Sequence, residues 1–350
     1  MVDPLRVGFI GAGANTTLRH IPGLQAIDGV ELIAVCNRSE ASGRRVADAH
    51  GIERVTVDPE DIFGADDIDA VCIGTWPYKH RDFVVRALET GKHVLVEARM
   101  AMNATEAREM LAASKARPDL VAQIVPAPFD FKSWRTIRRL VADGSLGTIR
   151  EVHVTSMNGN GLGDAPAHWR EQQRYSGANV MIMGILAEAV QRWLGPVERV
   201  SADAATFVTS RLDGDTGQPV TLDVPDSLGV IGRMENGARL TLRLSTVAAS
   251  TVEANGVSIY GSNGTLHWRM GDSMAFAPLG GPNAGQVAPL EPDAGAAHGW
   301  QVEADFVASI RDGAPVELTN FEDGLRYMQF TEAVYRSWNE GGRPIRLDEV

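Results

Sequence analysis

The 350-residue sequence has little of several features that mark particular classes of protein. It contains only two cysteines, Cys36 and Cys72, both in apolar runs and without a CxxC motif, which argues against a disulfide framework and favours a reducing cytoplasm. Its eight histidines show no metal-ligand spacing, so we predict no metal site. The formal net charge of -12 disfavours nucleic-acid partners and anionic membranes, since both require clustered Lys and Arg.

Long apolar runs are also missing. None approaches the ~20 residues of a membrane span, and the first residues, MVDPLRVGFIG, lack the pattern of a signal peptide. The composition, 44% hydrophobic and 22% charged, is ordinary for a globular protein, and the length allows one or two domains. We therefore expect a cytoplasmic protein that acts on a small molecule and has neither a membrane nor a nucleic acid as partner.

A glycine turn follows the first apolar run, Val7 to Ile10, and precedes a helix-compatible stretch. Such a turn lets the backbone approach a pyrophosphate, and the helix end offers N–H groups and a positive dipole. The fingerprint is imperfect, because its third glycine falls at Thr16 or, with one insertion, at Thr17. The residues predicted to bind a nucleotide here are Gly11, Ala12, Gly13, Asn15 and Thr16.

The second predicted strand, Val30 to Cys36, ends about twenty residues past the glycines, where the ribose-reading residue belongs. An NAD enzyme tends to carry Asp or Glu there, whereas this chain has Asn37, Arg38 and Ser39. Arg38 can pair with a 2′-phosphate and Ser39 can donate a hydrogen bond to it, although Arg38 can also be a solvated loop residue. We predict NADP(H) in preference to NAD(H).

Strands and helices then alternate up to about residue 126, which predicts a parallel, doubly wound sheet with helices on both faces, an α/β Rossmann domain over residues 1–126. Cofactors bind at the carboxyl ends of such strands. The further residues predicted to bind cofactor at these ends are Thr75, Trp76, His80, Glu97 and Ala98.

Residues 127–350 follow a different pattern, predicted to form an α+β domain with an open, mainly antiparallel sheet that binds substrate and joins subunits. Asn236-Gly237 and Asn263-Gly264 are hairpin signals. The C-terminal helix can pack back on the first domain. The other expected elements are helices at 132–147, 176–195, 300–312 and 321–340, strands at 149–157, 199–208, 226–247 and 257–270, and a Gly/Pro/Ala-rich surface loop or flap at 277–299.

Over nearly its whole length the chain resembles the Gfo/Idh/MocA family of nicotinamide-dependent oxidoreductases. The resemblance rests on GFIGAGANTTLRH, TWPYKH, ALETGKHVLVEARMAMNATEA, LVADGSLGTIREV and HWREQQRYSGANVMIMGILAEAVQRWLG. It implies a Rossmann domain followed by an α+β domain whose sheet often forms a subunit interface, so a homodimer or homotetramer is expected.

The chain departs from the family where the chemistry is expected. The family's Glu-Lys-Pro lysine, which contacts nicotinamide and substrate, maps to Ala98. The helix Asp and His map to Ile182 and Leu186, and a further frequent Asp maps to Ala189. With Met181 and Met183 beside them, these residues form an apolar stripe, which is a candidate for both core and pocket wall.

Hydride transfer from an alcohol still needs a group that takes the hydroxyl proton. The polar residues considered for this work are Arg99, Tyr78, Lys79, His168, Tyr175 and Glu188. Each has a structural alternative: Lys79 can be solvated, Arg99 can ion-pair, and Glu188 can pair with Arg192 at i+4. In the same way His80 can brace its turn, and His168 and Tyr175 can pack on their loop.

Three functions remain open from the sequence. The chain is an NAD(P)-dependent oxidoreductase with a non-standard site, acting on a carbonyl, alcohol or imine of a small, partly apolar substrate. Alternatively, it is a lyase or glycosidase-like enzyme that oxidises and re-reduces its substrate on a retained cofactor. As a third possibility, the chain binds a nucleotide without catalysing a reaction and serves as a sensor or scaffold.

Overall fold

The computed structural model describes residues 4–251 and 255–350, which form two compact units. Unit 1 contains residues up to Pro126 together with Gln301–Leu325, and unit 2 contains Ala127–Trp300 and Arg326–Val350. The division after Pro126 falls where the sequence pattern changes. The expectation assigned everything after it to the second domain, whereas the structure returns residues 301–325 to the first unit.

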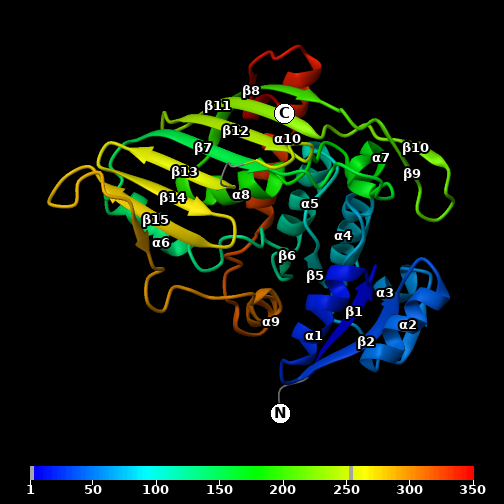
Figure 1. The fold of residues 1–350 in the computed structure, drawn as a ribbon. Coiled ribbons are helices and arrows are strands. Elements are labelled where there is room, and N and C mark those ends of the chain that lie inside the picture. Colours follow the sequence, from blue (N-terminus) through cyan, green and yellow to red (C-terminus); the bar gives the residue numbers. More distant parts are fainter. Residues whose placement is uncertain (1–3, 252–254) are drawn as a thin grey trace. The chain divides into compact units, whose positions relative to one another are not determined.

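Unit 1 is built on a six-stranded sheet with the order β3-β2-β1-β4-β5-β6 (Figure 1), in which all neighbouring strands are parallel. The central strands are apolar because helices cover both faces; every residue of β4, for example, is buried. The predicted doubly wound sheet is therefore confirmed. Its strands are β1 Leu5–Ile10, β2 Val30–Cys36, β3 Arg54–Thr56, β4 Ala70–Ile73, β5 His93–Val96 and β6 Ala122–Ile124.

The helices of unit 1 begin and end at residues that suit those positions. Ser39 and Asn103 each accept a hydrogen bond as N-caps, and Gly51 ends its helix with φ 69°. The helices are α1 Ile21–Gln25, α2 Glu40–His50, α3 Glu60–Phe63, α4 His80–Glu89, α5 Ala104–Ala116 and α9 Val302–Asp312. The helix α10 (Phe321–Asn339) begins in unit 1 and ends in unit 2.

Unit 2 is built on a nine-stranded sheet with the order β16-β15-β14-β13-β7-β12-β11-β8-β17 (Figure 1). Only β7 and β12 pair in parallel, so the predicted, mainly antiparallel sheet is confirmed. Its strands are β7 Ile149–Met157, β8 Val197–Ala205, β11 Ser227–Met234, β12 Arg239–Ser245, β13 Gly256–Gly261, β14 Gly264–Arg269, β15 Ser273–Pro278, β16 Ala288–Leu290 and β17 Ile345–Arg346; β9 Ser210–Leu212 and β10 Pro219–Thr221 form a separate ribbon.

The two faces of this sheet differ in character. On β12, Leu240, Leu242 and Leu244 are buried while Arg239 and Arg243 are exposed, which is the alternation of a half-buried strand. The apolar face packs on α8 (Met183–Leu194) and on the C-terminal half of α10, where Ser337 accepts a hydrogen bond from the Ala202 N–H. The other face carries Arg, Thr, Ser, His and Tyr side chains.

The prediction of one long helix at 176–195 is wrong. Instead, α7 (Gln173–Ser176) ends early, a non-helical stretch follows, and α8 begins only at Met183. The cause is local: Gly177 has φ 62° and ψ -137°, and Met181 has φ 45°, and neither conformation can continue a right-handed helix. The helix predicted at 132–147 is shorter as well, α6 Trp134–Ala142.

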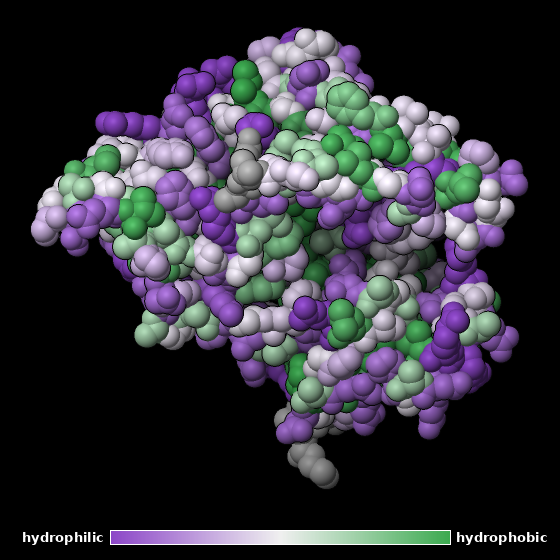
Figure 2. Space-filling view, in the orientation of Figure 1, coloured by the Kyte–Doolittle hydropathy of each residue, from purple (hydrophilic) through white to green (hydrophobic). Residues whose placement is uncertain are grey.

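Across the described ranges, none of the helices is both long enough and apolar enough to cross a membrane. Figure 2 shows hydrophilic residues interspersed with smaller hydrophobic areas on the visible face. Apart from the end of β15 and the short strand β16, the Gly/Pro-rich stretch at 277–299 is largely exposed loop, as expected.

Candidate functional site

The glycine turn after β1 is packed against the end of β4. Gly11 has φ 82°, and a Cβ added to it would lie 2.6 Å from Thr75 Cγ2 and 2.9 Å from the Thr75 nitrogen. Only glycine therefore fits here. By contrast, a Cβ on Gly13 would come no closer than 3.9 Å to any atom, so the space beside Gly13 is open.

Asn37 holds this turn in place. Its Oδ1 accepts a hydrogen bond of 2.8 Å from the Ala12 N–H, and the Gly11 N–H donates to the Cys36 carbonyl at 2.9 Å. The ends of β1 and β2 are thus tied together through one side chain. The sequence predicted that Asn37 contacts a nucleotide; in the structure its oxygen is committed to the turn, which leaves its NH₂ group as the atom that faces a ligand.

The helix after the turn contains a π-helical segment, Thr16–His20, in which the Ile21 N–H bonds to the Thr16 carbonyl. Pro22 follows directly and has no N–H to donate, so the shifted hydrogen-bond register replaces an α-helical bond that Pro22 cannot make. Asn15 lies in the first turn, where N–H groups have no partner within the helix. Thr16 is 1% exposed and packs beneath the turn.

A cavity of about 540 Å³ opens at the carboxyl ends of β1, β2 and β4. Its cationic lining residues are Arg38 and Lys79, and no Asp or Glu of the described residues lines it. Thr75 contributes a buried Oγ1 with no hydrogen-bond partner among the described residues. The full lining is Ile10, Gly11, Ala12, Gly13, Cys36, Asn37, Arg38, Ser42, Val57, Pro59, Gly74, Thr75, Trp76, Tyr78, Lys79 and Phe83.

The structure brings Tyr78 and Lys79, predicted as catalytic candidates, to this cavity. The Lys79 Nζ lies 5.4 Å from the Tyr78 ring centroid and 5.9 Å from that of Phe83. The Trp76 and Tyr78 rings lie 6.3 Å apart, which gives the cavity an aromatic wall. Ser39, predicted to bind a phosphate, instead caps α2, its Oγ accepting a hydrogen bond from the Ser42 N–H at 3.3 Å.

His80 lies outside the cavity. Its ring is fully buried, with Nδ1 3.0 Å from the Arg99 carbonyl and Nε2 2.9 Å from the Thr75 carbonyl. Burial lowers the pKa of this ring, while the hydrogen bonds to the Thr75 and Arg99 carbonyls act in the opposite direction. His80 therefore joins the loops that follow β4 and β5, which is the bracing role considered from the sequence rather than the predicted cofactor contact.

A buried charged cluster lies behind the end of β5. The His20 Nδ1 is 2.6 Å from the Glu303 carboxylate, and its Nε2 is 3.0 Å from the Glu97 carboxylate. Burial alone would lower the pKa of His20, but the two carboxylates raise it to about 9, so the ring is positively charged at neutral pH. Asn15 also donates to Glu97. Burial raises the Glu97 pKa, yet the bonds from His20 and Asn15 hold it below its usual value.

Glu97 was predicted as a cofactor contact. In the structure its carboxylate binds His20 and Asn15 in this buried cluster. Ala98 beside it is half-buried, and Arg99 is 5% exposed. Sequence reasoning missed His20 and Glu303, which are 283 residues apart. A local trace of this contact is the glycine at position 23, three residues after His20. In the structure an added Cβ at Gly23 would lie 2.8 Å from the Glu303 carboxyl carbon, so a larger residue would collide with Glu303.

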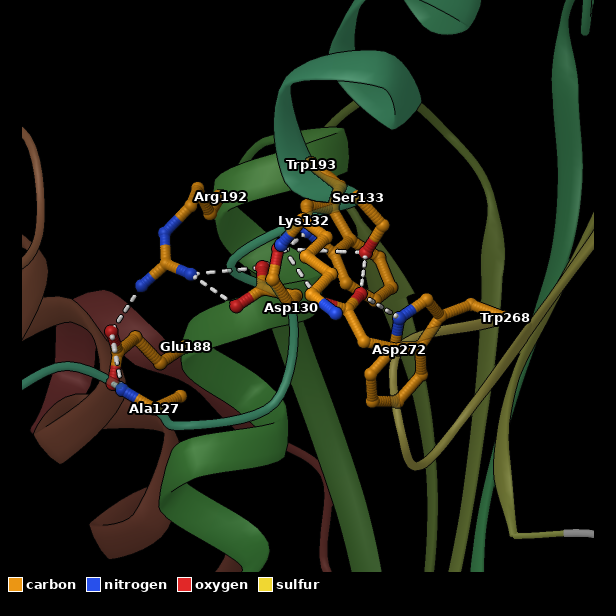
Figure 3. A network of polar contacts seen from close by, with 9 residues as sticks. All are labelled: Ala127, Asp130, Lys132, Ser133, Glu188, Arg192, Trp193, Trp268 and Asp272. Carbon is orange, nitrogen blue, oxygen red and sulfur yellow. Dashed lines mark hydrogen bonds and ion pairs between the residues drawn. The ribbon is translucent and has the colours of Figure 1, made fainter. Parts of the chain in front are cut away.

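In unit 2, Glu188 belongs to a buried network rather than to an open site (Figure 3). It pairs with Arg192 and accepts the Ala127 N–H at 3.3 Å. Arg192 also donates to both oxygens of Asp130 at 2.9 Å, and the Trp193 Nε1 donates to Asp130 at 2.7 Å. Glu188 is 4% exposed and Asp130 0%. The structure therefore shows Glu188 in the ion pair with Arg192, which the sequence offered as its structural alternative to a catalytic role.

The predicted apolar stripe divides into two parts. Leu186 and Ala189 are fully buried in the core of unit 2, so neither is a pocket wall there. Met181 and Ile182 precede α8 and are half-buried. Of the positions where the family resemblance places polar helix residues, Ile182 alone keeps an accessible side chain.

The two remaining candidates lie before α8: His168 begins a short 3-10 helix, and Tyr175 belongs to α7. His168 is the N-cap of a short 3-10 helix (Trp169–Glu171): its Nδ1 accepts the Arg170 N–H at 3.2 Å, and its own N–H donates to Glu171. Burial and Arg170 lower the pKa of His168. Tyr175 is half-buried, with the Arg174 guanidinium 4.6 Å from its ring centroid.

The residues of unit 1 fit a nicotinamide dinucleotide. The open space beside Gly13, the unpartnered Thr75 Oγ1 and the two cations match a ligand that carries phosphates and hydroxyls. For a metal ion no such match exists: within the described part of the chain no three His, Cys, Asp or Glu side chains gather to hold one. Unit 1 is thus a dinucleotide-binding fold, and the chain has the two-domain plan of an oxidoreductase.

The chain belongs to the Gfo/Idh/MocA family. Residues 5–124 match the family described as oxidoreductases with an NAD-binding Rossmann fold, and residues 134–267 match its C-terminal domain. The D-glucoside 3-dehydrogenase of Escherichia coli is 27% identical over 97% of both chains. The D-apiose dehydrogenase of Paraburkholderia graminis is 24% identical over 100% of this chain and 91% of that protein.

Solved structures agree in fold. A crystal structure of an oxidoreductase domain protein from Kribbella flavida covers 99% of this chain and 100% of its own, with a TM-score of 0.87 and 23% identity. A levoglucosan dehydrogenase in complex with NADH and levoglucosan covers 99% of this chain and 100% of its own, with a TM-score of 0.84 and 19% identity. The predictions of family, fold and NAD(P)-dependent oxidoreductase activity are confirmed.

Proposed function

We propose that this oxidoreductase uses NADP(H) and acts on a carbonyl, alcohol or imine of a small, partly apolar substrate. The observation that carries the cofactor half is the lining of the 540 Å³ cavity, which contains Arg38 and Lys79 and, among the residues that the structure describes, no carboxylate. A 2′-phosphate needs cations and is repelled by the Asp or Glu that binds a free ribose hydroxyl. Ser39 adds little, because its oxygen caps α2.

The substrate half of the proposal rests on two positions, one in each unit. Ala98 stands at the end of β5, where the family resemblance places a lysine, and Ile182 stands before α8, where it places an aspartate. Bound NADP(H) supplies the hydride chemistry. Three of the proteins named above are named as dehydrogenases of a D-glucoside, of D-apiose and of levoglucosan. The side chains of Ala98 and Ile182 offer no hydrogen-bonding partner, so they suit a substrate with fewer hydroxyl groups.

Arg99 and Tyr175 remain as the polar candidates for proton handling. Arg99 is nearly buried beside Ala98, and a guanidinium can polarise a carbonyl. Tyr175 is half-buried, and a phenol can relay a proton. Glu188 and His168 have structural partners, and Tyr78 and Lys79 line the nucleotide cavity, so these four are not proposed as acids or bases.

Titration of nicotinamide fluorescence tests the cofactor half. We expect NADPH to bind at least about tenfold more tightly than NADH, since a hydrogen bond to a charged group contributes about 1.5–3 kcal/mol. Arg38→Gln should remove this preference and leave NADH binding unchanged. Gly13→Ala should weaken both nucleotides, because the added methyl occupies the open space while disturbing no atom of the fold.

Arg44→Gln is the matched control, because Arg44 is an exposed arginine of α2 that does not line the cavity. It should leave both affinities unchanged. Tighter binding of NADH than of NADPH would contradict the NADP(H) assignment. An unchanged NADPH preference in Arg38→Gln would contradict the role of Arg38 in it.

A further inference from the structure

One buried histidine joins three elements of unit 1 that are far apart in the sequence. His20 ends the π-helical segment after the glycine turn, Glu97 directly follows β5, and Glu303 lies in α9, which packs beside α1 (Figure 1). His20 is 0% exposed and Glu303 3%. The segment 301–325 therefore returns to unit 1 with a carboxylate that reaches a buried ring next to the glycine turn.

The two contacts of the His20 ring determine its charge. Nδ1 lies 2.6 Å from a Glu303 carboxylate oxygen, and Nε2 lies 3.0 Å from a Glu97 carboxylate oxygen. A neutral imidazole has one N–H donor and one acceptor nitrogen, so it can donate to only one of two carboxylates. An imidazolium donates to both and compensates part of their buried negative charge. The cluster therefore has all its hydrogen bonds only when His20 is charged.

Glu97 uses its two carboxylate oxygens to hold two further parts of unit 1. The oxygen that faces His20 also accepts a hydrogen bond from the Asn15 side-chain amide, and the other accepts the Ala98 N–H at 3.1 Å. Asn15 stands in the helix turn at which the pyrophosphate of a dinucleotide binds. Ala98 stands where the family resemblance places the lysine that contacts the nicotinamide. A displacement of Glu97 therefore disturbs the nucleotide site at two places.

We propose that His20 is a positioning residue for the bound nucleotide: as an imidazolium held by Glu303, it keeps Glu97 in place. Glu97 in turn fixes the helix turn at Asn15 and the backbone at Ala98. Because its ring is fully buried, His20 acts through Glu97 rather than by touching the cofactor. Neither Asn15 nor Ala98 stands where the ribose 2′ position is read, so the effect applies to NADPH and NADH alike and does not depend on the proposed preference for NADP(H).

The titration of His20 is separate from that of the groups around it. Burial lowers the pKa of His20, and Glu303 and Glu97, which face its ring, raise it to about 9. Cys72 of β4 interacts electrostatically with both carboxylates, and His80 interacts with Glu97. Burial raises the pKa of the Cys72 thiol well above its ordinary value and lowers that of His80, so neither group titrates near pH 9.

Fluorescence titration of the full chain with NADPH and with NADH, from pH 7 to 9.5, tests the proposal. In wild type both affinities should stay constant to about pH 8 and fall as the pH rises through about 9. Glu303→Gln keeps a hydrogen-bonding group but removes a charge that raises the His20 pKa, so the fall should begin about one pH unit lower. His20→Gln should bind both nucleotides about tenfold more weakly at pH 7.5, with no further loss up to pH 9.

Asp312→Asn is the matched control, because Asp312 is an exposed carboxylate at the end of α9 and lies outside the cluster. It should follow the wild-type curve at every pH. The ratio of NADPH to NADH affinity should be the same in wild type, His20→Gln and Glu303→Gln. That ratio separates this proposal from the role of Arg38, which concerns the ratio alone.

Two results would overturn the proposal. If His20→Gln binds both nucleotides as tightly as wild type at pH 7.5, His20 stabilises unit 1 without positioning its ligand. If Glu303→Gln and wild type lose affinity at the same pH, the group that titrates is not His20. The second comparison decides the matter even where His20→Gln does not fold.

Discussion

Replacing Arg192 with methionine should lower the free energy of unfolding by about 3–5 kcal/mol. Arg192 lies between two buried carboxylates of the network in Figure 3, those of Glu188 and Asp130, and pairs with both. Methionine keeps most of the volume but removes the positive charge that pairs with both buried carboxylates. The penalty is that of an uncompensated buried charge, which exceeds the modest net value of most ion pairs.

Urea unfolding followed by tryptophan fluorescence measures this effect, because Trp193 is itself part of the network. Trp193→Phe is the matched control: it removes one hydrogen bond to Asp130 and no charge, and should cost about 1 kcal/mol from that bond plus a packing term. Equal losses in both variants, or a loss below about 1 kcal/mol for Arg192→Met, would show that the charges of this network do not stabilise unit 2.

Raising the pH from 6.5 to 9 should destabilise unit 1 through His20. The pKa of this ring is about 9 in the folded chain and 6.5 as its ordinary value. A group whose pKa is raised by folding stabilises the protein fully below the unfolded pKa, and that contribution is lost as the pH rises through the folded pKa. At about 1.4 kcal/mol for each pH unit, the contribution amounts to about 3 kcal/mol.

The measurement is the free energy of unfolding at several pH values for wild type and for His20→Gln. Glutamine can still bond to Glu97 and Glu303 but does not titrate, so the difference between the two proteins should shrink steadily from pH 6.5 to 9. His153→Gln controls for surface histidines, because His153 is exposed on the unit 2 sheet. A difference that stays constant over this range would mean that His20 is neutral in the folded chain.

The Rossmann unit could be predicted from the sequence because its signals are local. Apolar strands, glycines at fixed offsets and alternating helices each appear within a few residues, and together they determine a parallel sheet. The hairpins of unit 2 could be predicted for the same reason, from Asn236-Gly237 and Asn263-Gly264.

What the sequence did not reveal depends on the backbone or on distant residues. The helix predicted at 176–195 is interrupted by Gly177 and Met181, whose positive φ angles do not appear in a hydrophobic pattern. Leu186 belongs to the apolar stripe for which the sequence left both core and pocket wall open, and it lies in the core. Glu303 joins His20 from a position 283 residues along the chain.

The most direct test of the proposed function is the absorbance of NADPH at the nicotinamide band, followed against a panel of carbonyl compounds paired by polarity. We expect consumption of NADPH with ring-bearing or otherwise partly apolar carbonyls, and slower consumption with free sugars. The Ala98→Lys, Ile182→Asp double variant should not improve turnover of the best substrate. Faster turnover of free sugars, or conversion of a substrate with no net change in NADPH, would contradict the proposed function.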